Sequence, residues 1–499
     1  MKMIYESVQK LITYGIDKKL IFDVDVYVVR NNLMEALHLS NWEERDVSLG
    51  NESIDELLSP LVEYAVENGI IADTANSRDL FDTKLMGIFT PMPREIEAEF
   101  KKQYEKSPID ATNWYFDFSK NTNYVRAGRI AKDLKWLYEC EYGTLDITIN
   151  CSKPEKDPRD IAAARNSAAV SYPKCQLCAE NAGFCGTATH PARQNLRPIN
   201  MQVSGETWQL QYSPYGYYNE HCIAFNTAHI PMKIDAGVFD KMFDIIEFLP
   251  HYFVGSNADL PIVGGSILAH EHFQGGNYTF AMAKAPIETE FSFAKFPSVS
   301  AGIVKWPMSV IRVSSENRKE LSECCAHILA KWRSYSDKDA FIFAETDGTP
   351  HNTITPIARM NGDRFECDLV LRNNITTEER PLGVYHPNAS LHHIKKENIG
   401  LIEVMGLAVL PARLSKEITL LEKAILDKTD VASVPELASH ADWVCEILEK
   451  YSDINAENIT EILEREIGKV FLEVLHDAGV FKRTPDGKNA FLRFVETLN

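Results

Sequence analysis

The chain has 499 residues, of which 45% are hydrophobic and 25% charged, a composition typical of a folded protein with about two to four domains. Its 52 basic and 71 acidic residues give a formal net charge of −19, which repels polyanions and argues against nucleic acid as a partner. The ten cysteines are irregularly spaced and do not resemble a disulfide framework, so we expect reduced thiols and a cytoplasmic location.

The first residues predict a surface helix rather than a signal peptide. Ile4, Val8 and Leu11 recur at helical spacing, and acidic Glu6 interrupts the apolar positions. The longest apolar run, at 399–410, contains a glutamate and is too short to span a bilayer. We therefore expect no membrane association.

Helices dominate the first part of the chain. Residues 53–69 predict one of them, with Ser53 as the N-cap and Gly69 just past its end. Short β-rich pieces begin near Tyr142, and the polar stretch 151–160 is typical of an exposed loop or linker. We therefore predict a mainly helical N-terminal segment over residues 1–160.

The middle of the chain predicts two successive α+β units, 161–300 and 301–430. The first combines a helix with an apolar stripe at 235–249 with strands at 207–215, 221–232 and 267–274. The second combines a helix at 314–332 with strands at 339–346, 353–359 and 364–372. Residues 431–499 return to helices, notably 458–479.

Three hydrogen-bonding side chains stand at every second position of one predicted strand. Alternation along a strand would place His270, His272 and Gln274 on one face, and Gly275 and Gly276 would let a ligand approach closely. A catalytic or binding site and a pair of structural histidines both fit this pattern. The segment also begins like the zinc protease motif H-E-x-x-H, but its last position is Gln274, which excludes that motif.

A pair of cysteines offers half of a metal site. Cys175 and Cys178 have the C-x2-C spacing that lets two thiolates reach one tetrahedral metal ion. No second C-x2-C completes the site, so His229 and His270 are the natural further ligands. A redox pair, two buried thiols, or Cys185 as a third thiolate ligand remain alternatives.

Together these motifs resemble those of the galactose-1-phosphate uridylyltransferases of the histidine-triad superfamily, and most closely their second type, a longer bacterial form. The resemblance covers roughly residues 110–410. The stretches that carry it are 111–130, 147–158, 172–186, 213–221, 229–234 and 249–276. It implies an α+β fold of two histidine-triad-like antiparallel-sheet halves with helices, plus helical N- and C-terminal segments.

The resemblance implies a role for each matching residue. His272 corresponds to the nucleophile, and Gln274 to the amide that donates to a phosphate oxygen. Asn257 and Ser266 stand where the family contacts the nucleotide, with the spacing shifted by one or two residues. The implied zinc ligands are Cys175, Cys178, His229 and His270.

This sequence departs from the family pattern at two places. Glu271 stands where the better-studied type has proline. Residues 364–372 lack the spaced histidine pair that holds a further metal, so we predict no second metal. Independently of the resemblance, Arg193 and Arg197 are candidate phosphate clamps, because a guanidinium suits bidentate phosphate contacts.

The resemblance implies a UDP-glucose:hexose-1-phosphate uridylyltransferase of galactose metabolism. It would act by a ping-pong cycle through a covalent histidine, on UDP-glucose, UDP-galactose and hexose 1-phosphates. We expect a homodimer, structural Zn²⁺ and no organic cofactor. The alternatives are a related histidine-dependent nucleotidyl transferase, phosphorylase or hydrolase, and a non-catalytic, zinc-stapled nucleotide-binding module.

Overall fold

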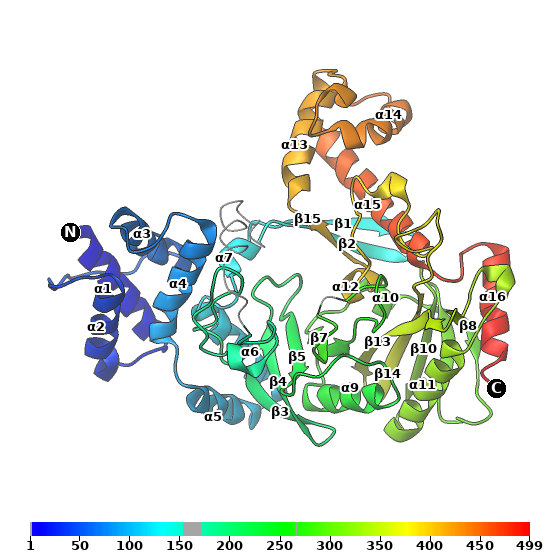
Figure 1. Ribbon diagram of the computed structural model, residues 1–499, viewed down its shortest axis with the longest axis horizontal. Helices are drawn as coiled ribbons and strands as arrows, with labels where there is room; N and C mark the ends of the chain where they lie inside the picture. Colours follow the sequence, from blue (N-terminus) through cyan, green and yellow to red (C-terminus); the bar gives the residue numbers. More distant parts are fainter. Residues whose placement is uncertain (1, 153–170, 266) are drawn as a thin grey trace. The chain divides into compact units, whose positions relative to one another are not determined.

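The computed structural model describes residues 2–152, 171–265 and 267–499, and it confirms the α+β class (Figure 1). The chain divides into two compact units. Unit 1 comprises Met1–Lys132, Ser152–Pro231 and Ala269–His272, and unit 2 comprises Asp133–Cys151, Met232–Leu268 and Phe273–Asn499. The domain boundaries that we expect near residues 160, 300 and 430 stay a prediction, and residues 153–160 of the loop expected at 151–160 lie outside the described residues.

Helices form the N-terminal part of unit 1, as predicted. The predicted cap at Ser53 is confirmed, because its hydroxyl accepts from the Glu56 amide while the Glu56 carboxylate accepts from the Ser53 amide at 2.7 Å. The apolar positions of the first helix are buried, including Val8 and Leu11. The helices are α1 (Lys2–Asp17), α2 (Val26–Ala36), α3 (Ile54–Glu67), α4 (Ala75–Phe89), α5 (Pro93–Tyr104), α6 (Pro108–Asn121) and α7 (Ala127–Ile130).

Three antiparallel strands complete unit 1, in the order β3 (Ile199–Val203), β4 (Glu206–Tyr212) and β5 (Cys222–Asn226). Alternation along β4 buries Trp208, Leu210 and Tyr212 on one face. The hydroxyl of Tyr115, on α6, donates to the carbonyl of Arg197 at 2.8 Å and so ties a helix to the start of this sheet. The strand β5 ends at Asn226, shortly before the candidate ligand His229.

Unit 2 has a larger antiparallel sheet with strand order β7-β6-β13-β14-β10-β9-β8. Helices α9 and α11 pack on β13 (Figure 1), and the predicted stripe of α9, including Phe239 and Phe243, is fully buried there. The helices are α9 (Gly237–Phe248), α10 (Ala281–Lys284) and α11 (Arg318–Arg333). The strands are β6 (Phe253–Gly255), β7 (His272–Gly276), β8 (Ile287–Phe291), β9 (Ser300–Val304), β10 (Val310–Ser315), β13 (Asn352–Asn361) and β14 (Arg364–Asn373).

A second sheet and a group of helices complete unit 2. Strand β2 (Gly143–Asn150) pairs antiparallel with β1 (Leu134–Cys140) and parallel with β15 (Leu407–Pro411). The predicted long helix is α15, which Gly479 ends. The helices are α12 (Leu401–Val404), α13 (Arg413–Leu426), α14 (Ala441–Lys450), α15 (Ile459–Ala478) and α16 (Pro485–Glu496). Of the helices in the described ranges, none combines the length and the apolar character that a bilayer crossing requires.

Three strand predictions need correction. The strand expected at 221–232 ends at Asn226, whose side chain accepts from the Ala228 amide and turns the chain. Residues 339–346 are mostly not a strand, because the Asp337 carboxylate accepts from the amides of Asp339 and Ala340 and caps a 3-10 turn. Only Glu345–Thr346 forms a short strand, β11, with β12 (Thr349–Pro350). The strand expected at 267–274 begins only at His272, so His270 lies before it. At Ile267 the backbone is left-handed, with φ of 67°, which no strand residue adopts.

Two buried histidines of unit 2 form a hydrogen-bonded chain with a carboxylate. His440 Nε2 donates to Glu417 Oε2 at 3.1 Å, and His393 Nδ1 lies 2.9 Å from His440 Nδ1. A carboxylate only accepts, so His440 presents its bare Nδ1 to the N–H of His393. Desolvation lowers the pKa of His440 and lowers the pKa of His393 to about 4. Both rings are therefore neutral at pH 7.

This burial makes stability fall in acid. An unfolded histidine takes up a proton below pH 6.5, whereas folded His393 resists protonation down to about pH 4, so stability is lost across that window. We expect His393→Gln to reduce the loss in unfolding free energy between pH 7 and pH 4.5 by about 2 kcal/mol. Urea denaturation at the two pH values measures it. The exposed His38→Gln variant should behave like the parent, and an unchanged loss in His393→Gln would contradict the assignment.

Candidate active site and metal centre

The structure brings together the four ligands expected from the sequence. Cys175 and Cys178 lie in the loop that leads into a 3-10 turn, His229 follows β5, and His270 precedes β7. Their ligand atoms all lie within 4.8 Å of one another. Cys175 Sγ is 3.6 Å from Cys178 Sγ and 3.2 Å from His270 Nδ1, and Cys178 Sγ is 3.2 Å from His229 Nδ1. All four residues belong to unit 1.

These distances fit a tetrahedral metal ion. Thiolate sulfurs and imidazole nitrogens bound to one zinc-like ion at about 2.3 and 2.0 Å lie roughly 3.5 to 3.8 Å apart. Burial raises the pKa of the Cys178 thiol to about 11, so its thiolate needs a nearby cation to be stable. The cluster can therefore hold a metal ion with two sulfur and two nitrogen ligands.

Residues outside the cluster orient its ligands, and these residues were not expected from the sequence. Asn181 Nδ2 donates to the carbonyls of Cys175 and Cys178, both at 2.8 Å, and His190 Nε2 donates to Asn181 Oδ1 at 2.7 Å. His270 Nε2 donates to the Asn226 carbonyl at 2.6 Å, which leaves its Nδ1 free to face the cysteines. No sequence motif distinguishes these asparagines from ordinary loop residues.

The candidate nucleophile is held in one tautomer. His272 is 4% exposed, and its Nδ1–H donates to the carbonyl of His270 at 2.7 Å. The other ring nitrogen, Nε2, consequently carries the lone pair. Desolvation lowers the pKa of His272 to about 4, so the imidazole is neutral at pH 7. The site thus offers a neutral nitrogen nucleophile of fixed orientation.

Gln274 lies two residues farther along β7. Alternation along the strand places its half-buried side chain on the face shared with His272. His270 does not belong to this face, because it precedes the strand and joins the metal cluster instead. The strand pattern therefore holds for two of the three polar residues.

The expected substrate contacts are placed as follows. Asn257 is buried, and its Oδ1 accepts from the Leu401 amide at 2.9 Å. Ser266 lies outside the described residues. Arg197 donates to the carbonyls of Thr90, Pro91, Gln194 and Leu196, so its donors serve the local backbone. Arg193 lies over the Tyr124 ring and donates to the Ala192 carbonyl at 3.0 Å.

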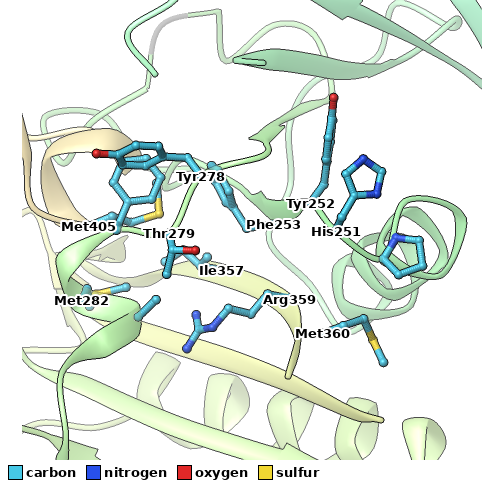
Figure 2. Close-up of a pocket in the computed structure, with 13 residues that line it drawn as sticks. His251, Tyr252, Phe253, Tyr278, Thr279, Met282, Ile357, Arg359, Met360 and Met405 are labelled. Atoms are coloured by element: carbon cyan, nitrogen blue, oxygen red, sulfur yellow. The ribbon is translucent and has the colours of Figure 1, made fainter. Parts of the chain in front are cut away.

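Unit 2 contains a small pocket of about 90 Å³ (Figure 2). Aromatic and methionine side chains line most of it, and Figure 2 shows Arg359 extending across it toward Met282. The Arg359 guanidinium is already paired with Asp368, at 2.9 Å, and with Glu366, so it offers no free charge for a phosphate. Arg312 pairs with the same Asp368 at 2.6 Å. Glu366 and Asp368 lie in the segment 364–372, where the sequence lacks the spaced histidines.

The chain matches known proteins over nearly its whole length. Models of the N-terminal and C-terminal domains of galactose-1-phosphate uridyl transferase match residues 30–231 and 246–452. A galactose-1-phosphate uridylyltransferase of Clostridium acetobutylicum is 51% identical over 99% of this chain and 100% of its own length. That of Fusobacterium nucleatum is 52% identical over 98% and 97%, and that of Bacillus subtilis is 47% identical over 99% and 98%. A crystal structure of yeast Ap4A phosphorylase covers 66% of this chain and 94% of its own, at 10% identity and a TM-score of 0.36.

An α+β chain with a buried neutral histidine beside a Cys2His2 cluster, matched from end to end by uridylyltransferases, is an enzyme of the nucleotidyltransferase class. The chain belongs to the galactose-1-phosphate uridylyltransferase family.

The cluster predicts about one divalent metal ion per chain. We expect Cys178→Ser to lower metal affinity at least 10-fold and to lower the thermal unfolding temperature, because a buried ligand and a tie between segments are lost. Plasma emission analysis after dialysis measures the metal. Exposed Cys185 is the matched control: Cys185→Ser should keep its metal, whereas loss there and retention in Cys178→Ser would contradict the ligand set.

Proposed function

We propose that this enzyme moves a uridylyl group from UDP-glucose to galactose 1-phosphate through a covalent bond to His272. The observation that carries the proposal is the hydrogen bond from His272 Nδ1 to the His270 carbonyl, at 2.7 Å. It leaves Nε2 as the nucleophile in a ring that burial keeps neutral. A neutral nucleophile brings no negative charge toward the pyrophosphate.

Each half-reaction is a displacement at one phosphorus. In the first, His272 Nε2 forms a bond to the α-phosphorus of UDP-glucose, and the bond from that phosphorus to the bridging oxygen breaks. Glucose 1-phosphate leaves with the electron pair. The imidazole becomes cationic, and the His270 carbonyl that accepts from Nδ1–H stabilises this charge. A phosphate oxygen of galactose 1-phosphate then displaces His272, giving UDP-galactose and the neutral ring.

Gln274 is the proposed donor to the phosphorus centre. Its side chain shares the face of β7 with His272, and its amide N–H groups can donate to nonbridging oxygens as charge builds there. Asn257, Ser266 and Arg193 stay proposed nucleotide or phosphate contacts. For Arg197, the four carbonyl contacts favour a structural role.

We propose Zn²⁺ as the metal that Cys175, Cys178, His229 and His270 would hold. When bound, it would supply a rigid structural tie, and two thiolates would balance its charge beside the reacting imidazole. The proposal further includes a homodimer in the cytoplasm, acting on UDP-sugars and hexose 1-phosphates without an organic cofactor.

The covalent step is directly testable. Incubation with UDP-glucose alone should add the mass of one uridylyl group to His272, detected by peptide mass spectrometry after an alkaline quench. His272→Gly should form no adduct and lose turnover, because the attacking nitrogen is removed. Exchange of labelled glucose 1-phosphate into UDP-glucose separates transfer from hydrolysis. Normal turnover by His272→Gly would refute the assignment.

The role of Gln274 makes a quantitative prediction. Loss of one preorganised donor to the transition state costs about 3 kcal/mol, so Gln274→Ala should lower kcat roughly 100-fold. The steady-state rate with UDP-glucose and galactose 1-phosphate measures it. Gln202→Ala, at an exposed position of β3, should leave kcat unchanged. A Gln274→Ala enzyme with the parent kcat would remove the amide from the mechanism.

A further inference from the structure

Glu271, whose carboxylate is buried, lies between His270 and His272 in the sequence. Glu271 is only 8% exposed, and burial of a carboxylate is unfavourable unless hydrogen bonds compensate. Its Oε2 accepts from Asn226 Nδ2 at 2.9 Å, and its carbonyl accepts from the Asn226 amide at 3.1 Å. Its own amide donates to the Ile230 carbonyl at 2.7 Å. Glu271 is therefore fixed at both its side chain and its backbone.

Asn226 holds this segment from several sides. Besides Glu271, its Nδ2 donates to Glu206 Oε2 at 3.1 Å, and its Oδ1 accepts from the Ala228 amide at 3.0 Å. Its backbone carbonyl accepts from His270 Nε2 at 2.6 Å. The residue is 3% exposed and ends β5. One asparagine thus contacts two consecutive residues, His270 and Glu271, directly before the candidate nucleophile.

These contacts continue to the reacting ring. The His270 carbonyl that accepts from His272 Nδ1 is part of the peptide group that links His270 to Glu271. A shift or rotation of that peptide moves the acceptor and with it the imidazole. We infer that Asn226 and Glu271 are positioning residues that hold this peptide so that His272 Nε2 points at the phosphorus. The inference rests on the proposed function of His272.

The contacts at position 226 require an amide side chain. Nδ2 has two hydrogens, one for each of the carboxylates of Glu206 and Glu271, while Oδ1 serves the Ala228 amide. The substitution Asn226→Asp would replace the donor with a third acceptor facing two carboxylates, which repels Glu271. A second substitution, Glu271→Gln, removes one of these charges and returns a donor to the pair.

Single-turnover kinetics with UDP-glucose, in the metal-loaded enzyme, tests the inference. Asn226→Asp should slow uridylyl transfer onto His272 by about 10- to 100-fold at saturating donor, the effect expected of a misplaced nucleophile. The concentration of UDP-glucose at half-maximal rate should stay within about two-fold, because neither positioning residue is proposed to touch substrate. Glu271→Gln keeps an acceptor for Asn226 and should be close to the parent, whereas Glu271→Ala should be slowed.

The double variant Asn226→Asp/Glu271→Gln supplies the decisive measurement. It swaps donor and acceptor between positions 226 and 271, and it should recover the part of the lost rate that comes from this pair, while the contact between position 226 and Glu206 stays unfavourable. A parent-like rate in Asn226→Asp, or no recovery in the double variant, would overturn the inference. Asn195→Asp is the matched control, since Asn195 is equally buried in unit 1 and donates to the Thr122 carbonyl at 2.9 Å.

Two further readouts keep the test interpretable. Metal content and circular dichroism of each variant report folding. If Asn226→Asp does not fold, the contrast between Glu271→Gln and Glu271→Ala applies the same criterion, and equal rates in these two would overturn the inference. Absence of the adduct in the parent enzyme would refute the proposed function itself, whereas adduct formation at the parent rate in all variants would refute only the positioning role.

Discussion

The chemistry proposed for this site depends on one hydrogen bond, from the ring of His272 to the backbone carbonyl of His270. It determines which nitrogen carries the lone pair, and it would give the ring a partner for the positive charge of the proposed reaction. Because the acceptor belongs to the peptide chain, the geometry of the ring is only as exact as the placement of that peptide. Most other contacts of the site can be understood as constraints on it.

Two kinds of constraint meet at this peptide. From one side, His270 is drawn toward Cys175 and Cys178, and its second nitrogen is tied to the backbone of Asn226. From the other, Glu271 is tied to the same asparagine through its carboxylate. His270, a proposed metal ligand, and Glu271, held by a buried hydrogen bond, therefore constrain the same peptide. Rigid support of this kind is what a reaction that needs close alignment requires.

The parts of the fold and of the site that depend on local sequence patterns could be predicted from the sequence. The cap at Ser53 and the stripe of α9 depend on residues within a few positions of each other, and both appear as expected. The C-x2-C spacing likewise indicated that the two cysteines lie together, and the further ligands expected from the rest of the chain, His229 and His270, do lie with them.

The misses arise where tertiary context decides. Asp337 caps a turn that enters an apolar run which otherwise fits a strand. Strand β1 is not evident from the sequence because its apolar residues Leu134 and Leu137 stay exposed along an edge of the sheet. The role of Asn226 could not be predicted from the sequence for another reason. A single asparagine at a strand end is common, and its partners Glu206 and Glu271 are 20 and 45 residues away.

The paired charges of the larger sheet of unit 2 have a consequence for how this part of the chain forms. Asp368 is fully buried, yet Arg312 and Arg359 neutralise it together with Glu366, all from within the chain. Each charge of this group therefore has its counterion within the chain as soon as the chain is synthesised. The ligands proposed for Zn²⁺ in unit 1 would depend instead on the supply of metal in the cell.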